Sequence, residues 1–135
     1  MGSSNLEVYI HFIWHTDDRQ ALLRGRLEKF VHRRVIEISE MHGIKPLAIN
    51  SAWTHTHVLT RWNATTKIGD LVKEWKSRTS KEWEPRDGAP QELEWQTGYG
   101  SYSIRTADVP GLMRYIGRQK HHHRQDSTIS AFERN

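Results

Sequence analysis

Cysteine is absent from the sequence, so the chain has no disulfide bond and no thiolate metal site. It also has no apolar run approaching the about 18 residues that a membrane-spanning helix requires. The first residues, Met1 to Asn5, lack the apolar core of a signal peptide. We therefore expect a cytoplasmic protein without a membrane partner.

The residues that are present are typical of a globular protein. Of the 135 residues, 36% are hydrophobic and 27% are charged, which favours a folded chain over a disordered one. We predict one domain over residues 1–135, with a flexible leader at 1–5 and a flexible tail at 125–135. The net charge of +4 and the pI near 9.6 favour a polyanionic partner such as nucleic acid.

Hydrophobic periodicity predicts four strands and three helices. The strands are expected at residues 6–15, 44–52, 52–62 and 100–105, with a hairpin turn around 50–52, and the helices at 23–42, 67–83 and 108–123. Gly43 should end the first helix, Thr66 should cap the second, and Pro110 fits only the first turn of the third. The order of the first six elements predicts a ferredoxin-like α+β domain, a four-stranded antiparallel sheet with helices on one face. The last helix is an addition to this fold.

Two histidines occupy alternate positions of the third predicted strand. Side chains at i and i+2 of a strand point to the same face, so His55 and His57 should lie side by side. Two imidazoles at that spacing can bind one divalent metal ion if a third ligand comes from elsewhere in the chain. The alternative is an ordinary pair of surface or packing residues.

The last predicted helix carries a tyrosine and a glutamine four residues apart, and therefore on one face. Arg114 and Arg118 flank Tyr115, and this basic setting would favour both a phosphate and a phenolate. Tyr115 could attack a phosphodiester, and the side-chain carbonyl of Gln119 could complete a metal site with His55 and His57. The alternatives are a tyrosine in the core and a solvated glutamine.

Five segments between Val8 and His123 carry a resemblance to a known family. They are Tyr9-Ile10-His11-Phe12-Ile13-Trp14, His55-Thr56-His57-Val58-Leu59, Ile68-Gly69-Asp70-Leu71-Val72-Lys73, Trp95-Gln96-Thr97-Gly98-Tyr99-Gly100-Ser101-Tyr102-Ser103 and Tyr115-Ile116-Gly117-Arg118-Gln119. In these segments the chain resembles the single-tyrosine HUH transposases of small bacterial insertion sequences, the IS200-like family. REP-associated tyrosine transposases are relatives of that family.

The resemblance implies an enzyme that cuts and rejoins single-stranded DNA at the ends of a mobile element, with Mg²⁺ or Mn²⁺. By this resemblance Tyr115 is the nucleophile that forms a covalent 5′-phosphotyrosine, and His55, His57 and Gln119 hold the metal. It also implies a homodimer that recognises DNA hairpins through basic surfaces. The basic residues that we expect to contact DNA lie on the second and third predicted helices: Lys73, Lys76, Arg78, Lys81, Arg114 and Arg118.

Two other function classes stay open at this stage. One is a catalytically inactive DNA-binding protein on the same scaffold, such as a domesticated repressor. The other is a metal-dependent hydrolase, which is disfavoured because no Asp or Glu adjoins the histidine pair as a general base. The segment before that pair, Ala52-Trp53-Thr54, departs from the acidic or proline-containing segment usual in the family.

The run His121-His122-His123 has two interpretations. It is either a solvated helix end, or His122 or His123 approaches the metal.

Overall fold

The structure is a computed structural model in which residues 5–85 and 92–119 are described. Its strands are β1 (Tyr9–His15), β2 (Lys45–Ser51), β3 (His55–Arg61) and β4 (Gly100–Ile104), and its helices are α1 (Gly25–Met41), α2 (Ile68–Glu82) and α3 (Val109–Gly117). Two short 3₁₀ turns, η1 (Asp17–Arg19) and η2 (Thr106–Asp108), precede α1 and α3. Within the described ranges, no helix has the length and apolar character that crossing a membrane would require.

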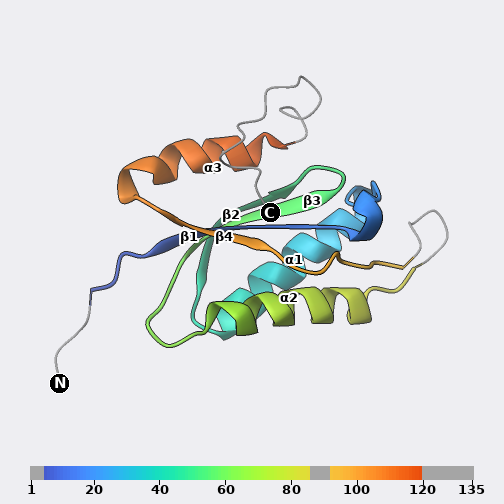
Figure 1. Cartoon of the computed structure of the whole chain (residues 1–135), viewed down its shortest axis with the longest axis horizontal. Helices are drawn as coiled ribbons and strands as arrows, with labels where there is room; N and C mark the ends of the chain where they lie inside the picture. The colour runs from blue at the N-terminus through green and yellow to red at the C-terminus, as the bar shows by residue number, and fades with distance from the viewer. Residues whose placement is uncertain (1–4, 86–91, 120–135) are drawn as a thin grey trace.

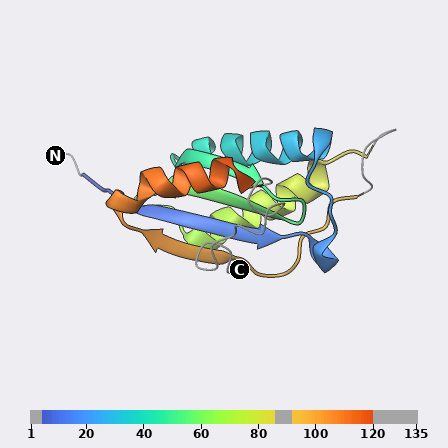
Figure 2. The same cartoon turned by 90° about the horizontal axis from the view of Figure 1, so that it is seen from above.

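The four strands form one antiparallel sheet in the order β2-β3-β1-β4. Helices α1 and α2 cover one face of this sheet, and α3 lies across the other face (Figure 1). Figure 2, seen from above, shows α3 in front of the strands. The predicted ferredoxin-like α+β fold is confirmed, and the added C-terminal helix lies opposite the first two helices.

The larger core lies between the sheet and helices α1 and α2. Phe12 and Trp14 alternate along β1 and point toward these helices, where both rings contact Trp75 of α2. The Trp75 ring stacks on Trp14 at 5.5 Å between centroids, and its indole N–H donates to the Ser39 hydroxyl of α1 at 3.0 Å. These contacts join both helices to the central strand and make the sheet a rigid platform.

A smaller core lies between the sheet and α3. Leu59 of β3 packs there against Leu112, Tyr115 and Ile116, all of which are buried. Because residues of one parity in a strand share a face, the side of β3 that carries Leu59 also carries His55 and His57. The α3 helix therefore covers the face of the sheet on which both histidines lie.

Two predicted boundaries at the first helix and the hairpin are wrong. The first helix begins at Gly25, not at residue 23, although Leu23 is fully buried. Leu23 lies in an irregular segment, and its N–H donates to the Trp53 carbonyl at 3.0 Å, so it packs on the core without belonging to the helix. The hairpin turn lies at residues 52–54, not at 50–52, because the pairing of β2 with β3 runs on to Ser51 and Thr56.

Two further predictions concern the ends of α2 and α3. Thr66 does not cap α2, which begins at Ile68 without a side-chain cap; the Thr66 N–H instead donates to the Asn63 side chain at 2.9 Å. Pro110 lies in the first turn of α3, as predicted. The continuous helix α3 ends at Gly117, Arg118 forms a turn and Gln119 is helical again, while residues 120–123 of the predicted helix lie outside the described residues.

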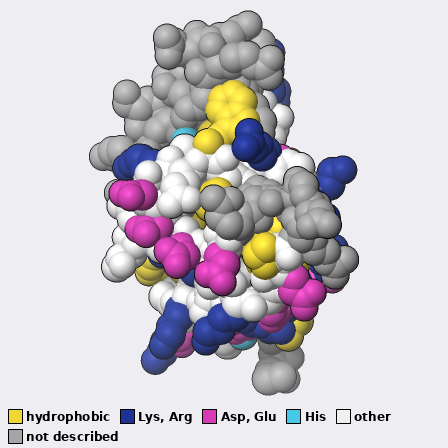
Figure 3. Space-filling model, turned by 90° about the vertical axis from the view of Figure 1, so that its right-hand side faces the viewer, with side chains coloured by type: hydrophobic (Ala, Val, Ile, Leu, Met, Phe, Trp, Pro, Cys, Tyr) yellow, Lys and Arg dark blue, Asp and Glu magenta, His cyan; other side chains and the backbone are white. Residues whose placement is uncertain are grey.

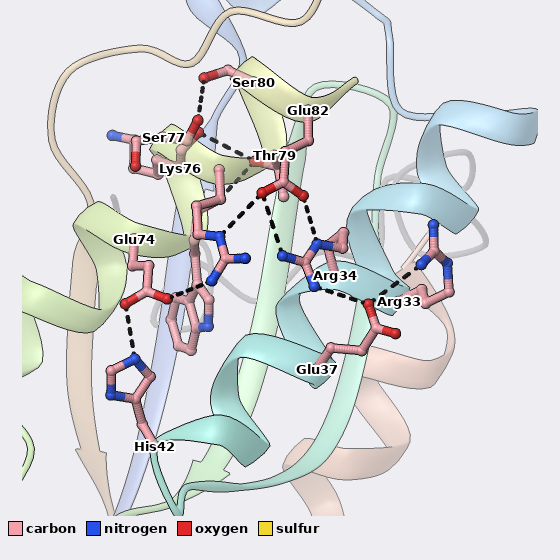
Figure 4. Close-up of polar contacts among 12 residues, drawn as sticks. Arg33, Arg34, Glu37, His42, Glu74, Lys76, Ser77, Thr79, Ser80 and Glu82 are labelled. Atoms are coloured by element: carbon pink, nitrogen blue, oxygen red, sulfur yellow. Dashed lines mark hydrogen bonds and ion pairs between the residues drawn. The ribbon is translucent and has the colours of Figure 1, made fainter. Parts of the chain in front are cut away.

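Charged side chains join α1 to α2 across their exposed sides (Figure 4). Glu82 of α2 accepts a hydrogen bond from Arg34 of α1 at 2.9 Å and another from Arg78 at 3.1 Å. Partial burial of Glu82 raises its pKa, but the hydrogen bonds and the attraction of both guanidinium groups outweigh this, so its pKa lies below the usual value. The carboxylate thus stabilises the folded chain only while it is ionised.

We expect Glu82→Gln to lower the free energy of unfolding at pH 7 by less than about 1 kcal/mol, since the site is partly exposed to solvent. A carboxyl whose pKa falls on folding contributes stability above its unfolded pKa and loses it as the pH drops through the folded value. The difference between variant and wild type should therefore shrink below about pH 4. Urea unfolding at pH 7 and pH 3 measures this difference in unfolding free energy, with the exposed Glu40→Gln as control. A difference that is larger at pH 3 than at pH 7 would contradict the lowered pKa of Glu82.

Candidate active site

The two predicted metal ligands lie together on β3, which is an interior strand of the sheet. His55 and His57 are 5% and 0% exposed, and their ring centroids are 5.1 Å apart. Both face the side of the sheet that α3 covers. The i and i+2 spacing therefore places the two imidazoles side by side, as the sequence predicted.

Two further histidines, which the sequence analysis did not select, extend this pair onto β1. His15 lies opposite His55 in the antiparallel register, with 4.7 Å between the ring centroids. His11 lies diagonally from His57, and its Nε2 is 2.8 Å from Nδ1 of His57. The signal in the sequence was the parity of the first strand, which places His11 and His15 on one face, but only the pairing of β1 with β3 brings them to the first pair.

The predicted nucleophile reaches this cluster from α3. The ring of Tyr115 meets the ring of His57 edge to face, with 6.3 Å between centroids, and the side chain is 4% exposed. Helix α3 packs on β2 and β3 of its own chain, and the Asn50 side-chain amide donates to the Gly117 carbonyl at 3.2 Å. The structure thus brings Tyr115 to the histidines within a single chain.

Gln119 follows two residues after α3 and is fully buried. Its amide nitrogen lies 3.4 Å from the Tyr115 backbone carbonyl, a long hydrogen bond, and its Oε1 has no hydrogen-bond partner among the described residues. A buried carbonyl oxygen without a partner is costly, and a bound cation would satisfy it. The burial of this oxygen and its lack of a described hydrogen-bond partner fit a metal ligand.

The histidine rings are oriented by hydrogen bonds at Nδ1. Nδ1 of His55 is 3.0 Å from the Thr54 hydroxyl, and Nδ1 of His57 is 2.8 Å from His11. With Nδ1 engaged in each ring, Nε2 is the nitrogen that would bind a metal ion. In the described part of the chain, no three His, Asp or Glu side chains gather closely enough to hold a metal by themselves.

The four basic residues predicted on α2 fall into two groups. Lys76 and Arg78 bind other parts of the protein: Lys76 donates to the backbone carbonyls of Gln96 and Gly98 at 2.7 and 2.8 Å, and burial lowers its pKa. Arg78 pairs with Glu74 and Glu82. Lys73 and Lys81 are exposed and line a hollow of about 870 Å³ between α2 and the segment before β4.

The surface around this hollow is not uniformly basic. In Figure 3, Asp and Glu side chains lie beside Lys and Arg side chains on the visible face. Asp17, Glu92 and Glu94 are among the residues that line the hollow. A polyanion bound there would meet charges of both signs.

The two arginines predicted on the last helix both lie at the surface. Arg114 lines a groove of about 550 Å³ between β4 and α3, and Tyr115 borders the same groove. Arg118 is exposed in the turn that ends α3. His121, His122 and His123 lie outside the described residues.

Comparison with known proteins gives a family and two solved structures. Residues 4–119 match the family model described as transposase, IS200 like. No protein of curated function matches the chain. A crystal structure of a Deinococcus radiodurans R1 protein assigned as a transposase aligns with a TM-score of 0.64 at 19% identity, over 88% of this chain and 96% of that one. A REP-associated tyrosine transposase bound to a REP hairpin aligns with a TM-score of 0.66 at 14% identity, over 95% and 76%.

At these identities the two solved structures show a common fold. The family model covers most of the sequence, including the histidine pair, Tyr115 and Gln119. The chain therefore belongs to the IS200-like transposase family.

Proposed function

We propose that this transposase cleaves and rejoins single-stranded DNA through a covalent bond between Tyr115 and a 5′ phosphate. The observation that carries the proposal is the position of the Tyr115 ring, 6.3 Å from the ring of His57 on the facing strand. The match to the transposase family supports the same reading.

The reaction conserves the energy of the phosphodiester bond. The Tyr115 hydroxyl loses its proton to solvent, and its oxygen forms a bond to the scissile phosphorus. The bond from phosphorus to the 3′ oxygen breaks, and that oxygen leaves with the electron pair and takes up a proton. Rejoining is the reverse reaction with a different 3′ hydroxyl, so no external energy source is required.

The residues that would hold a divalent ion are His55, His57 and Gln119, through two imidazole nitrogens and one amide oxygen. Mg²⁺ or Mn²⁺ bound there would polarise the phosphate and stabilise the departing oxyanion. The fit of these residues rests on the oriented rings of the two histidines and on the Gln119 oxygen, which has no hydrogen-bond partner in the described part of the chain. His55 and His57 lie on an interior strand that is paired on both sides, which fixes the backbone positions of the two residues.

The DNA partner that we propose is a single strand that folds into a hairpin. A solved transposase of the same fold is bound to a REP hairpin, which supports this choice. We also propose that the working form is a homodimer. The alternative, a DNA-binding protein without activity, is disfavoured because Tyr115, both histidines and Gln119 are all present.

The direct test is an adduct assay with wild-type protein and hairpin oligonucleotides taken from the DNA that flanks the gene. With Mn²⁺ or Mg²⁺ present, a DNA fragment should stay on the protein under denaturing conditions. Chelation of the metal should remove this product. Tight hairpin binding without any adduct, across the panel and with either ion, would favour the inactive DNA-binding protein.

Replacing Gln119 separates a metal ligand from a packing residue. Gln119→Leu removes a buried oxygen that has no hydrogen-bond partner among residues 5–85 and 92–119, so the melting temperature should stay the same or rise. The affinity for Mn²⁺ should fall by at least about 10-fold, because one of three ligands is lost. Gln119→Glu keeps an oxygen at the same position and should retain metal binding. Equal Mn²⁺ affinity in the leucine variant and wild type would remove Gln119 from the site.

The two exposed lysines on α2 provide a test of the DNA surface. Lys73→Ala with Lys81→Ala should weaken hairpin binding and reduce the slope of log affinity against log salt by about 1.4 to 1.8. Two lysines exposed elsewhere, Lys29 and Lys45, serve as a matched control pair. An unchanged slope in the first pair would place the DNA on another face. Fluorescence anisotropy between 50 and 200 mM salt covers a suitable range.

A further inference from the structure

His11 forms a close polar contact with His57, one of the two proposed histidine ligands. The side chain is 1% exposed in the middle of β1, and its Nε2 is 2.8 Å from Nδ1 of His57. The two ring planes are inclined by only 15°, with centroids 5.0 Å apart. An N–H bond lies in the plane of its ring, so nearly parallel rings suit a hydrogen bond between the two nitrogens.

This contact constrains the position of a hydrogen atom. A neutral imidazole carries one N–H and one lone pair, so one nitrogen of the pair donates and the other accepts. If His57 binds a metal through Nε2, that nitrogen offers its lone pair, and the hydrogen of His57 is on Nδ1. His11 must then accept at Nε2 and carry its own hydrogen on Nδ1.

The position of His11 is itself fixed on two sides. Its strand pairs with β3, which carries His57, and with β4, where Tyr102 is its register partner. The ring of Tyr102 lies 6.4 Å from that of His11, on the side away from His57. His11 thus stands between two neighbours on a strand that is interior to the sheet, and its acceptor nitrogen is held toward His57.

We infer that His11 is a positioning residue: it accepts the Nδ1 hydrogen of His57 and so holds that ring in the tautomer and orientation that present Nε2 to the metal. The inference rests on the proposed function, which makes His57 a ligand. It assigns a role to a residue 46 positions away in the sequence. Partners of this kind raise the basicity of a ligating histidine and reduce the entropy it loses on binding.

The tautomer can be read without metal or DNA. In ¹⁵N-labelled wild-type protein, long-range ¹H–¹⁵N correlation of the imidazoles should show His57 protonated at Nδ1 and His11 at Nδ1. His11→Phe keeps a ring in the space but removes the acceptor. In that variant the His57 signal should shift toward a mixture of tautomers. Finding the hydrogen of His57 on Nε2 in the wild type would overturn the inference, whatever the variants do.

Metal affinity gives the second measurement. Mn²⁺ binding, followed by the electron paramagnetic resonance of the free ion, should weaken about 10- to 100-fold in His11→Phe. His11→Gln places an amide oxygen near the position of Nε2 and should recover most of that loss. The matched control is His32→Phe, since the His32 ring also bonds a side chain, the Ser51 hydroxyl at 2.8 Å, but belongs to α1 on the other side of the sheet.

The outcomes separate the inference from the proposed function. Wild-type affinity in a folded His11→Phe variant would overturn the inference, even if the adduct assay succeeds. If His11→Phe does not fold, the Mn²⁺ affinity of His11→Gln and the tautomer of His57 in the wild type test the inference instead. If the wild type binds no Mn²⁺ at all, the proposed metal site fails, and with it the role of His11 in metal binding. The tautomer measurement would then still show whether His11 orients His57.

Discussion

Tyr115→Phe is expected to abolish the covalent adduct between the protein and hairpin DNA, a fall of at least about 10⁴-fold in its rate of formation. The substitution removes only the attacking oxygen. The phenyl ring keeps the contacts of Tyr115 with Leu59, Leu112 and Ile116, so the fold and the affinity for DNA should change little. An oligonucleotide labelled at its 3′ end reports the adduct on a denaturing gel, because the retained fragment is the one that begins with the 5′ phosphate.

Two other tyrosines make this experiment specific. Tyr9→Phe is the matched control, since Tyr9 packs at the edge of the same small core and should leave the adduct unchanged. Tyr102 lies near the cluster, with its ring 6.4 Å from that of His11. An adduct that survives Tyr115→Phe and disappears in Tyr102→Phe would identify Tyr102 as the nucleophile. An adduct that survives both changes would exclude a tyrosine mechanism through either residue.

The parts of the site that the sequence predicted are those set by local geometry. The two-residue period of a strand places His55 and His57 on one face, and no long-range information is needed. The four-residue spacing of Tyr115 and Gln119 was read in the same way, as one turn of helix. The structure ends α3 between them at Gly117, yet Gln119 still bonds the backbone of Tyr115 across that turn. The four-residue spacing therefore predicted a local contact that the structure contains.

The parts that the sequence did not predict depend on which elements pair. His11 and His57 are 46 residues apart, and only the antiparallel register of β1 with β3 brings them to 2.8 Å. Likewise, the helical periodicity of α2 showed Lys76 and Arg78 outside the buried stripe but not that both were already bound. Lys76 holds the backbone before β4, and Arg78 holds two carboxylates. Such partners are chosen by tertiary packing, which no local pattern records.

His57→Ala is expected to lower adduct formation by at least about 10³-fold, which corresponds to about 4 kcal/mol of transition-state stabilisation. The change removes one of three proposed ligands of the metal. It also leaves Nε2 of His11 without the nitrogen that now lies 2.8 Å away, so some loss of stability should accompany it. Mn²⁺ binding should fall in parallel with the adduct, while hairpin DNA binding should persist.

The control for this change must distinguish a lost ligand from a weakened fold. Leu59→Ala is suited to this, because Leu59 is two residues further along β3 on the same face, is fully buried and packs against Tyr115. It should cost about 2 to 5 kcal/mol of unfolding free energy and leave Mn²⁺ affinity near that of the wild type. If Leu59→Ala reduced metal binding as much as His57→Ala, the effect would follow from loss of packing. If only His57→Ala did so, the imidazole would be acting as a ligand on a strand whose fold is otherwise intact.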